Sequence, residues 1–389
     1  MSLRDSAIVA FAETKIMEKS DRDVWELDAE VMESLLDKSG FEKAEIDGLV
    51  LAGLSSTGAG DYFWAQTTAD ELGLELDFCE SVHIGGCSAT GCVARAAAAI
   101  DAGLCTTALL LFADTGVAEP NRRDRNYRRE WTDPYGLLGP PGAFGLLTRR
   151  YEHQYGLDFE MLGKLAVTQR SHAVLNENAC EKLRKPITVA DYLNSRMIAE
   201  PIRLLDCVMR CDAAAGLLVT SRKRAKEKGI AKCVVPIAYS ERTNFRGGEN
   251  FVDVTRTGHE VAGKRAFAQA GITPRDIASF HPYDDFLLAI LLQLESLGFC
   301  ERGQGSSFIR ETNFAFDGDL PLNTGGGQIS AGQAACCSHN LTEAVRQLMG
   351  EGGPRQVKNT ANALVTGIGW INYARNWGTS SALVLVPDA

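Results

Sequence analysis

The feature that most constrains the fold of this 389-residue chain is a glycine-rich segment that occurs twice in outline. The first copy lies at residues 85–91 and the second at residues 325–333. Each copy leads into a stretch with helical periodicity and then into a short apolar run typical of a buried strand, at residues 108–112 and 363–366. This repetition predicts a duplicated strand–turn–helix–strand unit, and therefore two similar halves.

The composition and the remaining pattern agree with two packed halves. The chain is 45% hydrophobic and 23% charged, which is enough apolar material for two ordinary cores. Ahead of the first glycine-rich turn, the pattern predicts strands at residues 7–11 and 46–52 and helices at residues 21–37 and 62–72. Such a βαβαβ series indicates a sheet that is covered by helices.

The pattern of strands stops between residues 114 and 210, where prolines and a long helical stretch over residues 149–173 take its place. A strand pattern resumes at residues 213–220. We therefore expect an N-terminal half of residues 1–232, with an insertion at about 114–210, and a C-terminal half of residues 233–389.

Charge and hydropathy exclude some classes of partner. The formal net charge of −10 argues against nucleic acid or an anionic membrane surface as the main partner, because both attract clustered Lys and Arg. No apolar run reaches the ~20 residues that a membrane-spanning helix needs. The start of the sequence has no signal-peptide profile. We expect a cytoplasmic protein without a membrane span.

The eleven cysteines are scattered, which predicts reduced thiols that serve mainly as small core residues. Cys207 and Cys211 have a C-x-x-x-C spacing, but no second Cys or His pair lies nearby to complete a zinc site. Cys336 and Cys337 are adjacent on a predicted helix, so they point to different faces. No metal site is predicted.

Four stretches carry a resemblance that covers nearly the whole chain; they lie at residues 149–156, 201–215, 283–300 and 320–326. In this order they resemble the thiolase superfamily, specifically the branch similar to the thiolase domain of sterol carrier protein X. The resemblance implies an α/β thiolase fold, in which two βαβαβ halves related by a pseudo-twofold axis form five αβαβα layers. It also implies a loop-domain insertion in the first half and a homodimer.

The resemblance implies a chemistry as well. The substrate would be a coenzyme A thioester, with no covalently bound cofactor, and a cysteine at a helix N-terminus would take the acyl group. Cys87 falls at that position, where unpaired N–H groups and the helix dipole favour a thiolate. The alternative interpretation is that Cys87 is a small core residue at a tight helix contact, because the sequence after it is rich in alanine.

Three departures from the family pattern affect this chemistry. The histidine of the family's Gly-His-Pro turn is replaced by Gln333, which cannot act as a base near neutral pH. The branch's histidine before Asp-Cys-Phe is replaced by Tyr283, with His281 two residues earlier. The later loop that often supplies a cysteine instead contains Gly367 and Gly369.

Each remaining candidate has a functional and a structural interpretation. Tyr283 is either a donor to a substrate carbonyl or a buried tyrosine that ties down a strand end. Gln333 is expected to orient backbone or substrate by hydrogen bonds, and His281 ranks below Tyr283 as a catalytic group. Asp284 and Asp285 are predicted to be the cap and first-turn acid of a helix that starts near residue 286.

Contacts to the coenzyme are predicted at Gly326 and Gly327 of the second glycine-rich turn and at Gly367 and Gly369 of the later loop. Arg128 belongs to a basic run at residues 122–129, where the family's lid over the acyl-CoA lies, and is a candidate to bind phosphate. The alternative is that this run is simply a solvated face.

These observations leave three functions open. The main hypothesis is an acyltransferase similar to acetyl-CoA acetyltransferases, with Cys87 as nucleophile and an unidentified base. The alternative is a retro-aldolase that cleaves the side chain of a β-hydroxyacyl-CoA through tyrosines, together with an OB-fold partner that often has a zinc ribbon. The third is a non-catalytic subunit. Retention of Cys87 favours the first, whereas Tyr283 and Gln333 favour the second, and the acyl chain stays undetermined.

Overall fold

The computed structural model describes residues 3–52, 63–120, 132–137, 139–245, 253–369 and 377–388. Nine strands of these ranges form one mixed sheet: β1 Ser6–Glu13, β2 Gly48–Ala52, β3 Phe78–Val82, β4 Thr107–Leu111, β7 Ala215–Ser221, β8 Val234–Thr243, β9 Phe280–His281, β10 Ala363–Ile368 and β11 Thr379–Pro387. Their order across the sheet is β3-β2-β4-β7-β1-β8-β11-β10-β9. β1 and β8 are joined only by the pairing of Ile8 with Val234, so two groups of strands meet at a narrow junction.

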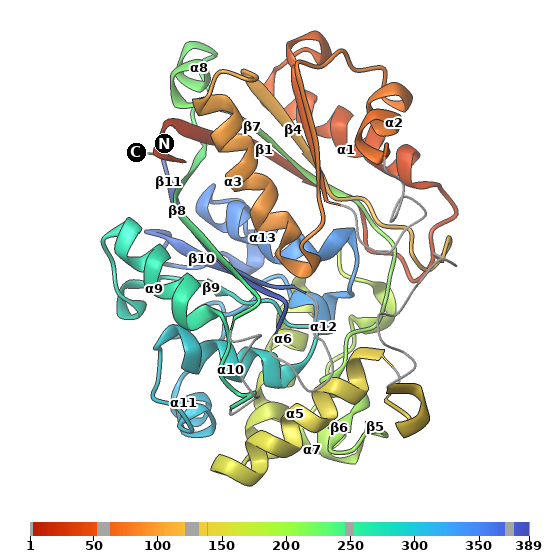
Figure 1. The fold of residues 1–389 in the computed structure, drawn as a ribbon, viewed down its shortest axis with the longest axis vertical. Coiled ribbons are helices and arrows are strands. Elements are labelled where there is room, and N and C mark those ends of the chain that lie inside the picture. The colour runs from red at the N-terminus through yellow and green to blue at the C-terminus, as the bar shows by residue number, and fades with distance from the viewer. Residues whose placement is uncertain are drawn as a thin grey trace.

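The helices lie in layers around these two groups of strands (Figure 1). Those that pack on the sheet are α1 Val24–Ser39, α2 Trp64–Glu71, α3 Ser88–Asp101, α8 Arg222–Glu227, α9 His259–Ala270, α10 Leu287–Leu297 and α13 His339–Leu348. The helices α5 Gly139–Tyr155, α6 Phe159–Leu175, α7 Val189–Asn194 and α11 Gly305–Glu311 lie towards one end of the molecule, in the lower part of Figure 1. The short helix α12 Gly327–Ala331 packs on α13 and on α6.

Three hydrophobic clusters show how the layers are stacked. One cluster joins α1 and α2 to the first group of strands. A second contains residues of α3 and α13 together with strands of both groups, so these two helices form the central layer. A third joins α9 and α10 to the second group of strands. This is the predicted five-layered αβαβα arrangement, and each layer exists because a helix or sheet buries its apolar face against the next.

Local sequence explains where the elements begin and end. The side chain of Asp23 accepts hydrogen bonds from N–H groups in the first turn of α1, and the Glu26 carboxylate accepts one from the Asp23 N–H. The helix ends at Gly40, which has a left-handed backbone. β4 is buried along its whole length, which explains its unbroken apolar run. The duplicated unit predicted from sequence is present as α3 leading to β4 and α13 leading to β10.

Within the predicted insertion, two helices, α5 and α6, occupy the stretch where we expected one. The expected helix over residues 149–173 is wrong, because Gly156 adopts a left-handed backbone after α5 and Asp158 caps the start of α6. The insertion also holds a two-stranded sheet of β5 Met197–Ala199 and β6 Ile202–Arg203. The division of the chain at residue 232 stays a prediction. Within the described ranges, no helix is both long and apolar enough to cross a membrane.

Candidate active site

The first glycine-rich turn lies where the two groups of strands meet. Its residues Gly85–Cys87 form a short 3-10 helix that leads directly into α3. A Cβ atom on Gly367 would lie 2.7 Å from the Cα atom of Cys87, and one on Gly369 would lie 3.0 Å from the Ile84 carbonyl oxygen. Gly367 lies in β10 and Gly369 directly follows it. Because neither has a side chain, this part of the chain can approach the Cys87 turn closely. Their contact with a coenzyme stays a prediction.

Cys87 is fully buried at this junction. Burial, with a smaller contribution from the negative charge of Glu241, raises the pKa of its thiol to about 12, although hydrogen bonds to Ser381 and Gly369 oppose the shift. The thiol is therefore protonated at neutral pH, despite its place at the start of α3. A protonated thiol is a poor nucleophile. The role of Cys87 as nucleophile stays a prediction that its surroundings do not favour.

Tyr283 is the other candidate that the fold brings to this turn. A Cβ atom on Gly86 would overlap the Tyr283 ring, so the ring lies directly on the backbone next to Cys87. The Tyr283 hydroxyl lies 3.4 Å from the Cys337 sulfur. Burial raises the pKa of Tyr283 well above its usual range, and the neighbouring Cys337, Asp285 and Cys87 add to this shift. At neutral pH the phenol keeps its proton and can act as a hydrogen-bond donor.

Cys337 reaches Tyr283 from a segment with an unusual backbone. Ala335, Cys336 and Cys337 have φ angles of 49°, 50° and 61°. The helix predicted for the adjacent cysteines is therefore wrong, because three residues in succession are left-handed. Cys336 points away from the site and its thiol donates to the Ala52 carbonyl at 2.9 Å. A strained segment of this kind is expected next to a functional site, where the surrounding structure holds it in place.

The predicted role of Asp284 is wrong. Its carboxylate accepts hydrogen bonds from the N–H groups of Gln328 at 3.0 Å and Ile329 at 3.3 Å, and from the Asn340 side chain at 3.0 Å. Asp284 thus binds the start of α12, whereas α10 begins at Leu287 without a side-chain cap. Burial raises the pKa of Asp284 to about 7, against the opposing effect of these hydrogen bonds.

Asp285 is a candidate that sequence reasoning placed as a first-turn acid. One of its carboxylate oxygens is buried without a hydrogen-bond partner among the described residues. Burial and the nearby Asp284 raise the pKa of Asp285 to about 8. Its charge acts on both Tyr283 and Cys337, so the carboxyl lies in the same cluster. The sequence placed Asp285 by the helical periodicity of the apolar residues after it. Periodicity does not determine the direction of the Asp285 side chain.

The other two catalytic candidates, Gln333 and His281, are bonded to groups other than Tyr283 and Cys87. The Gln333 N–H donates to the Met209 carbonyl at 2.9 Å, its carbonyl accepts from the Cys211 N–H at 2.9 Å, and its side chain contacts Gln328. His281 is buried in β9, where its Nε2 atom lies 3.3 Å from the Ser279 hydroxyl. Burial lowers the pKa of His281 to about 4, so the ring is neutral.

His259 is a buried histidine near Cys87 that no sequence motif singled out. Its Nε2 atom lies 3.0 Å from the carbonyl oxygen of Gly367, the residue that packs on the Cys87 turn. Burial lowers the pKa of His259 to about 4, and the hydrogen bonds to the backbone of Gly367 and Ser381 only partly oppose this. The neutral ring can donate from Nε2 to the Gly367 carbonyl oxygen, which helps to hold Gly367 in place.

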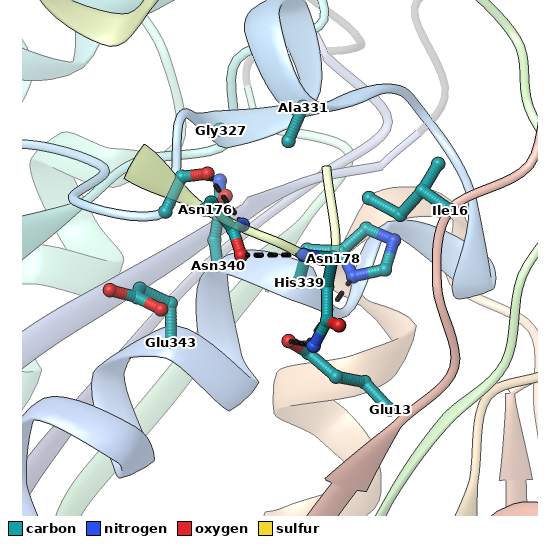
Figure 2. A pocket seen from close by; sticks show the side chains of 10 residues that line it. Glu13, Ile16, Asn176, Asn178, Gly327, Ala331, His339, Asn340 and Glu343 are labelled. Atoms are coloured by element: carbon teal, nitrogen blue, oxygen red, sulfur yellow. Dashed lines mark hydrogen bonds and ion pairs between the residues drawn. The ribbon is translucent and has the colours of Figure 1, made fainter. Parts of the chain in front are cut away.

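Gly326 and Gly327 form the second glycine-rich turn, beside a small polar cavity (Figure 2). A Cβ atom on Gly327 would overlap the Asp284 carboxylate, and one on Gly326 would lie 2.6 Å from the Ala173 side chain. The cavity is lined by Glu13, Ile16, Asn176, Asn178, Gly325, Gly327, Ala331, His339, Asn340 and Glu343. Its free space of about 10 Å³ suits one water molecule. Coenzyme contacts of this turn stay a prediction.

Two further predictions concern a phosphate contact of Arg128 and the presence of a metal site. Arg128 lies outside the described residues, so its predicted contact with phosphate has no structural account here. Across the parts of the chain that the structure describes, no group of three or more His, Cys, Asp or Glu side chains is placed to hold a metal ion.

Comparison with known proteins shows which proteins this chain is similar to. A family model described as thiolase C-terminal domain-like matches residues 243–376. A steroid side-chain-cleaving aldolase of Thermomonospora curvata is 32% identical over 380 residues, which cover 93% of this chain and 94% of the relative. A 17-hydroxy-3-oxo-4-pregnene-20-carboxyl-CoA lyase of Mycobacterium tuberculosis is 32% identical over 367 residues, 89% of this chain and 92% of that protein.

Among solved structures, one titled Ltp2-ChsH2(DUF35) aldolase superposes with a TM-score of 0.87 and 29% identity, and the match covers 98% of both chains. The fold and the sequence similarity together identify the class: the chain belongs to the thiolase superfamily, in the branch that resembles the thiolase domain of sterol carrier protein X. The predicted fold is confirmed.

Proposed function

We propose that this protein is a carbon–carbon lyase that cleaves a β-hydroxyacyl-CoA thioester by a retro-aldol reaction. The observation that carries the proposal is the position of Tyr283, whose protonated phenol lies on the Gly86 backbone next to a deeply buried Cys87. Two relatives named as an aldolase and a CoA lyase support this activity over acyl transfer.

The reaction needs a proton acceptor and a group that stabilises an oxyanion. The acceptor takes the proton of the substrate's β-hydroxyl, the Cα–Cβ bond breaks, and its electron pair moves to the thioester oxygen to form an enolate. A ketone or aldehyde leaves, and protonation of the enolate at Cα gives the shortened acyl-CoA. We assign Tyr283 as the donor to the thioester oxygen, because preorganised donors stabilise such an oxyanion.

Asp285 is the proton acceptor that the site offers. Its pKa of about 8 lies near an ordinary working pH, which suits a group that accepts and returns a proton. One of its carboxylate oxygens has no hydrogen-bond partner among the described residues, whereas the oxygens of Asp284 are bonded to α12 and Asn340. This distinction between adjacent aspartates supports Asp285 in the chemical role and Asp284 in a structural one.

We also propose an OB-fold protein as partner. The support is the solved structure of similar fold, whose title pairs the aldolase with a DUF35 protein. Homodimer formation and cytoplasmic location remain predictions from sequence.

The test is cleavage of a β-hydroxyacyl-CoA by this protein, with and without its OB-fold partner, with the carbonyl product measured by mass spectrometry. We expect Tyr283→Phe to lower kcat/KM by about 100-fold or more while the circular dichroism spectrum is unchanged. Cys87→Ala should keep the cleavage activity. A stable acyl adduct with acetyl-CoA that is lost in Cys87→Ala, together with no carbonyl product, would establish acyl transfer instead.

A further inference from the structure

Cys180 and Cys211 are two thiols held by the same short segment of backbone. The N–H of Cys180 donates to the Ala331 carbonyl at 2.9 Å, and the N–H of Cys211 donates to the Gln333 carbonyl at 2.9 Å. Ala331 and Gln333 are two residues apart, so one short segment holds the backbones of both cysteines. The two thiols shift each other's pKa in opposite directions as hydrogen-bond partners.

The packing around the pair is close. Gly332 lies between the two anchoring residues with a φ of 115°, and a Cβ atom there would lie 2.9 Å from the Cys211 sulfur. Both thiols are buried, with 2% of Cys180 and 3% of Cys211 exposed. Lys182 and Glu18 form an exposed ion pair at 2.7 Å, and both thiols act electrostatically on Lys182. The dithiol therefore lies just beneath the surface.

The two thiols differ in acidity. The hydrogen bond from Cys211 lowers the pKa of the Cys180 thiol and raises that of Cys211, so the first proton leaves the pair from Cys180. By contrast, burial raises the pKa of Cys87 and of Cys92. A thiolate is the form that reacts with peroxides and disulfides.

We propose that Cys180 and Cys211 form a reversible disulfide, a redox modification site separate from Cys87 that reacts with hydrogen peroxide. The Cys180 thiolate attacks one peroxide oxygen, the O–O bond breaks, and hydroxide leaves as Cys180 becomes a sulfenic acid. The Cys211 sulfur then attacks the Cys180 sulfur and the S–O bond breaks. The protons of the two thiols end on the two departing oxygens, so two thiols and one peroxide give one disulfide and two waters.

The bond has a structural consequence for the second glycine-rich turn. It links the chain after α6 to the chain before β7 across the segment of Ala331 and Gln333. The disulfide therefore clamps the backbone that carries Gln333, and a thiol reductant releases it. This inference does not depend on the proposed lyase activity.

The test is peptide mapping of the full-length wild-type protein after titration with hydrogen peroxide, without reduction of the digest. We expect the Cys180–Cys211 linked peptide to form before Cys79 or Cys300, two half-buried single thiols, is oxidised. Dithiothreitol should restore both thiols. Oxidation of Cys79 or Cys300 while Cys180 and Cys211 stay reduced, or a link from Cys180 to another cysteine, would overturn the proposal.

Single substitutions separate the two steps. In Cys211→Ser, peroxide should leave Cys180 as a sulfenic acid that dimedone traps, because no second thiol can resolve it. In Cys180→Ser, Cys211 should not react at the same dose. Cys300→Ser is the matched control and should form the disulfide at the wild-type dose. Hydrogen exchange of the oxidised wild-type protein should be slower at residues 331–333, and equal exchange in the two redox states would overturn the clamping of this segment.

Discussion

The two glycine-rich turns of this protein share an outline but are closed in different ways. The first leads straight into α3, a helix of 14 residues, and its start is buried against Gly367 of the other half. The second leads into α12, a helix of only 5 residues, and the Asp284 carboxylate occupies the first N–H groups of that helix.

The difference shows how duplicated units acquire separate roles. A helix start with free N–H groups favours an anion, and at α12 a side chain of the protein already fills that place. At the second turn, the Asp284 carboxylate therefore holds the start of α12 by hydrogen bonds. At the first turn, Tyr283 and Cys87 meet on the Gly86 backbone, which makes this turn the better place for chemistry.

The largest expected effect is from Gly86→Ala, which tests the contact at the first turn. The added methyl would overlap the Tyr283 ring and lie 2.5 Å from the Ile368 carbonyl oxygen, so backbone must move. We expect a loss of about 3 kcal/mol or more in the free energy of unfolding, measured in urea. Gly103→Ala is the control, because only its left-handed φ of 71° costs energy, about 1 kcal/mol. Equal losses would contradict the close contact at Gly86.

Asp284→Ala tests the hydrogen bonds between Asp284 and the start of α12. It leaves two N–H groups of α12 and the Asn340 amide without their buried acceptor, at an expected cost of about 2 kcal/mol. Asp284→Asn keeps one acceptor oxygen and should lose less. Urea unfolding measures both, and hydrogen exchange at α12 should increase in the same order. Equal losses in the two variants would show that charge rather than hydrogen bonding holds α12.

Asp285→Asn distinguishes the two adjacent aspartates by their response to pH. The folded-state pKa of about 8 lies above the usual 3.8, so this group's stabilisation is full below pH 4 and is lost as the pH rises to 8. The neutral asparagine does not lose it. We therefore expect Asp285→Asn to be more stable than wild type at pH 8 by on the order of 1 kcal/mol, and the advantage to vanish at pH 4. Thermal unfolding at both pH values measures this, and a larger advantage at pH 4 would contradict the raised pKa.

The smallest expected effect is from Cys87→Ser. The serine hydroxyl can keep the bond to Ser381, so stability should change by about 1 kcal/mol or less. In the wild type, iodoacetamide at neutral pH should label Cys87 more slowly than the half-buried Cys79, because burial keeps the Cys87 thiol protonated. Preferential labelling of Cys87, measured by peptide mass spectrometry, would instead indicate an activated nucleophile.

Periodicity alone predicted much of the scaffold. The strands at residues 46–52 and 108–112 are present as β2 and β4, and the helix at residues 21–37 is present as α1. These elements bury apolar faces at the spacing of a strand or a helix, which a sequence records directly. The single helix expected over residues 149–173 failed because one glycine and one capping aspartate end a helix without disturbing its apolar spacing.

By itself the sequence determined the duplication and the resemblance to thiolases, because these depend only on residue identity and order. The tertiary structure alone decided that Asp284 binds α12, that one Asp285 oxygen has no partner within the described ranges, and that Tyr283 lies on Gly86. It also decided that the Cys87 thiol is buried against residues almost 300 positions away. Burial and partners set hydrogen bonding and pKa, and both come from chain segments that are distant in sequence.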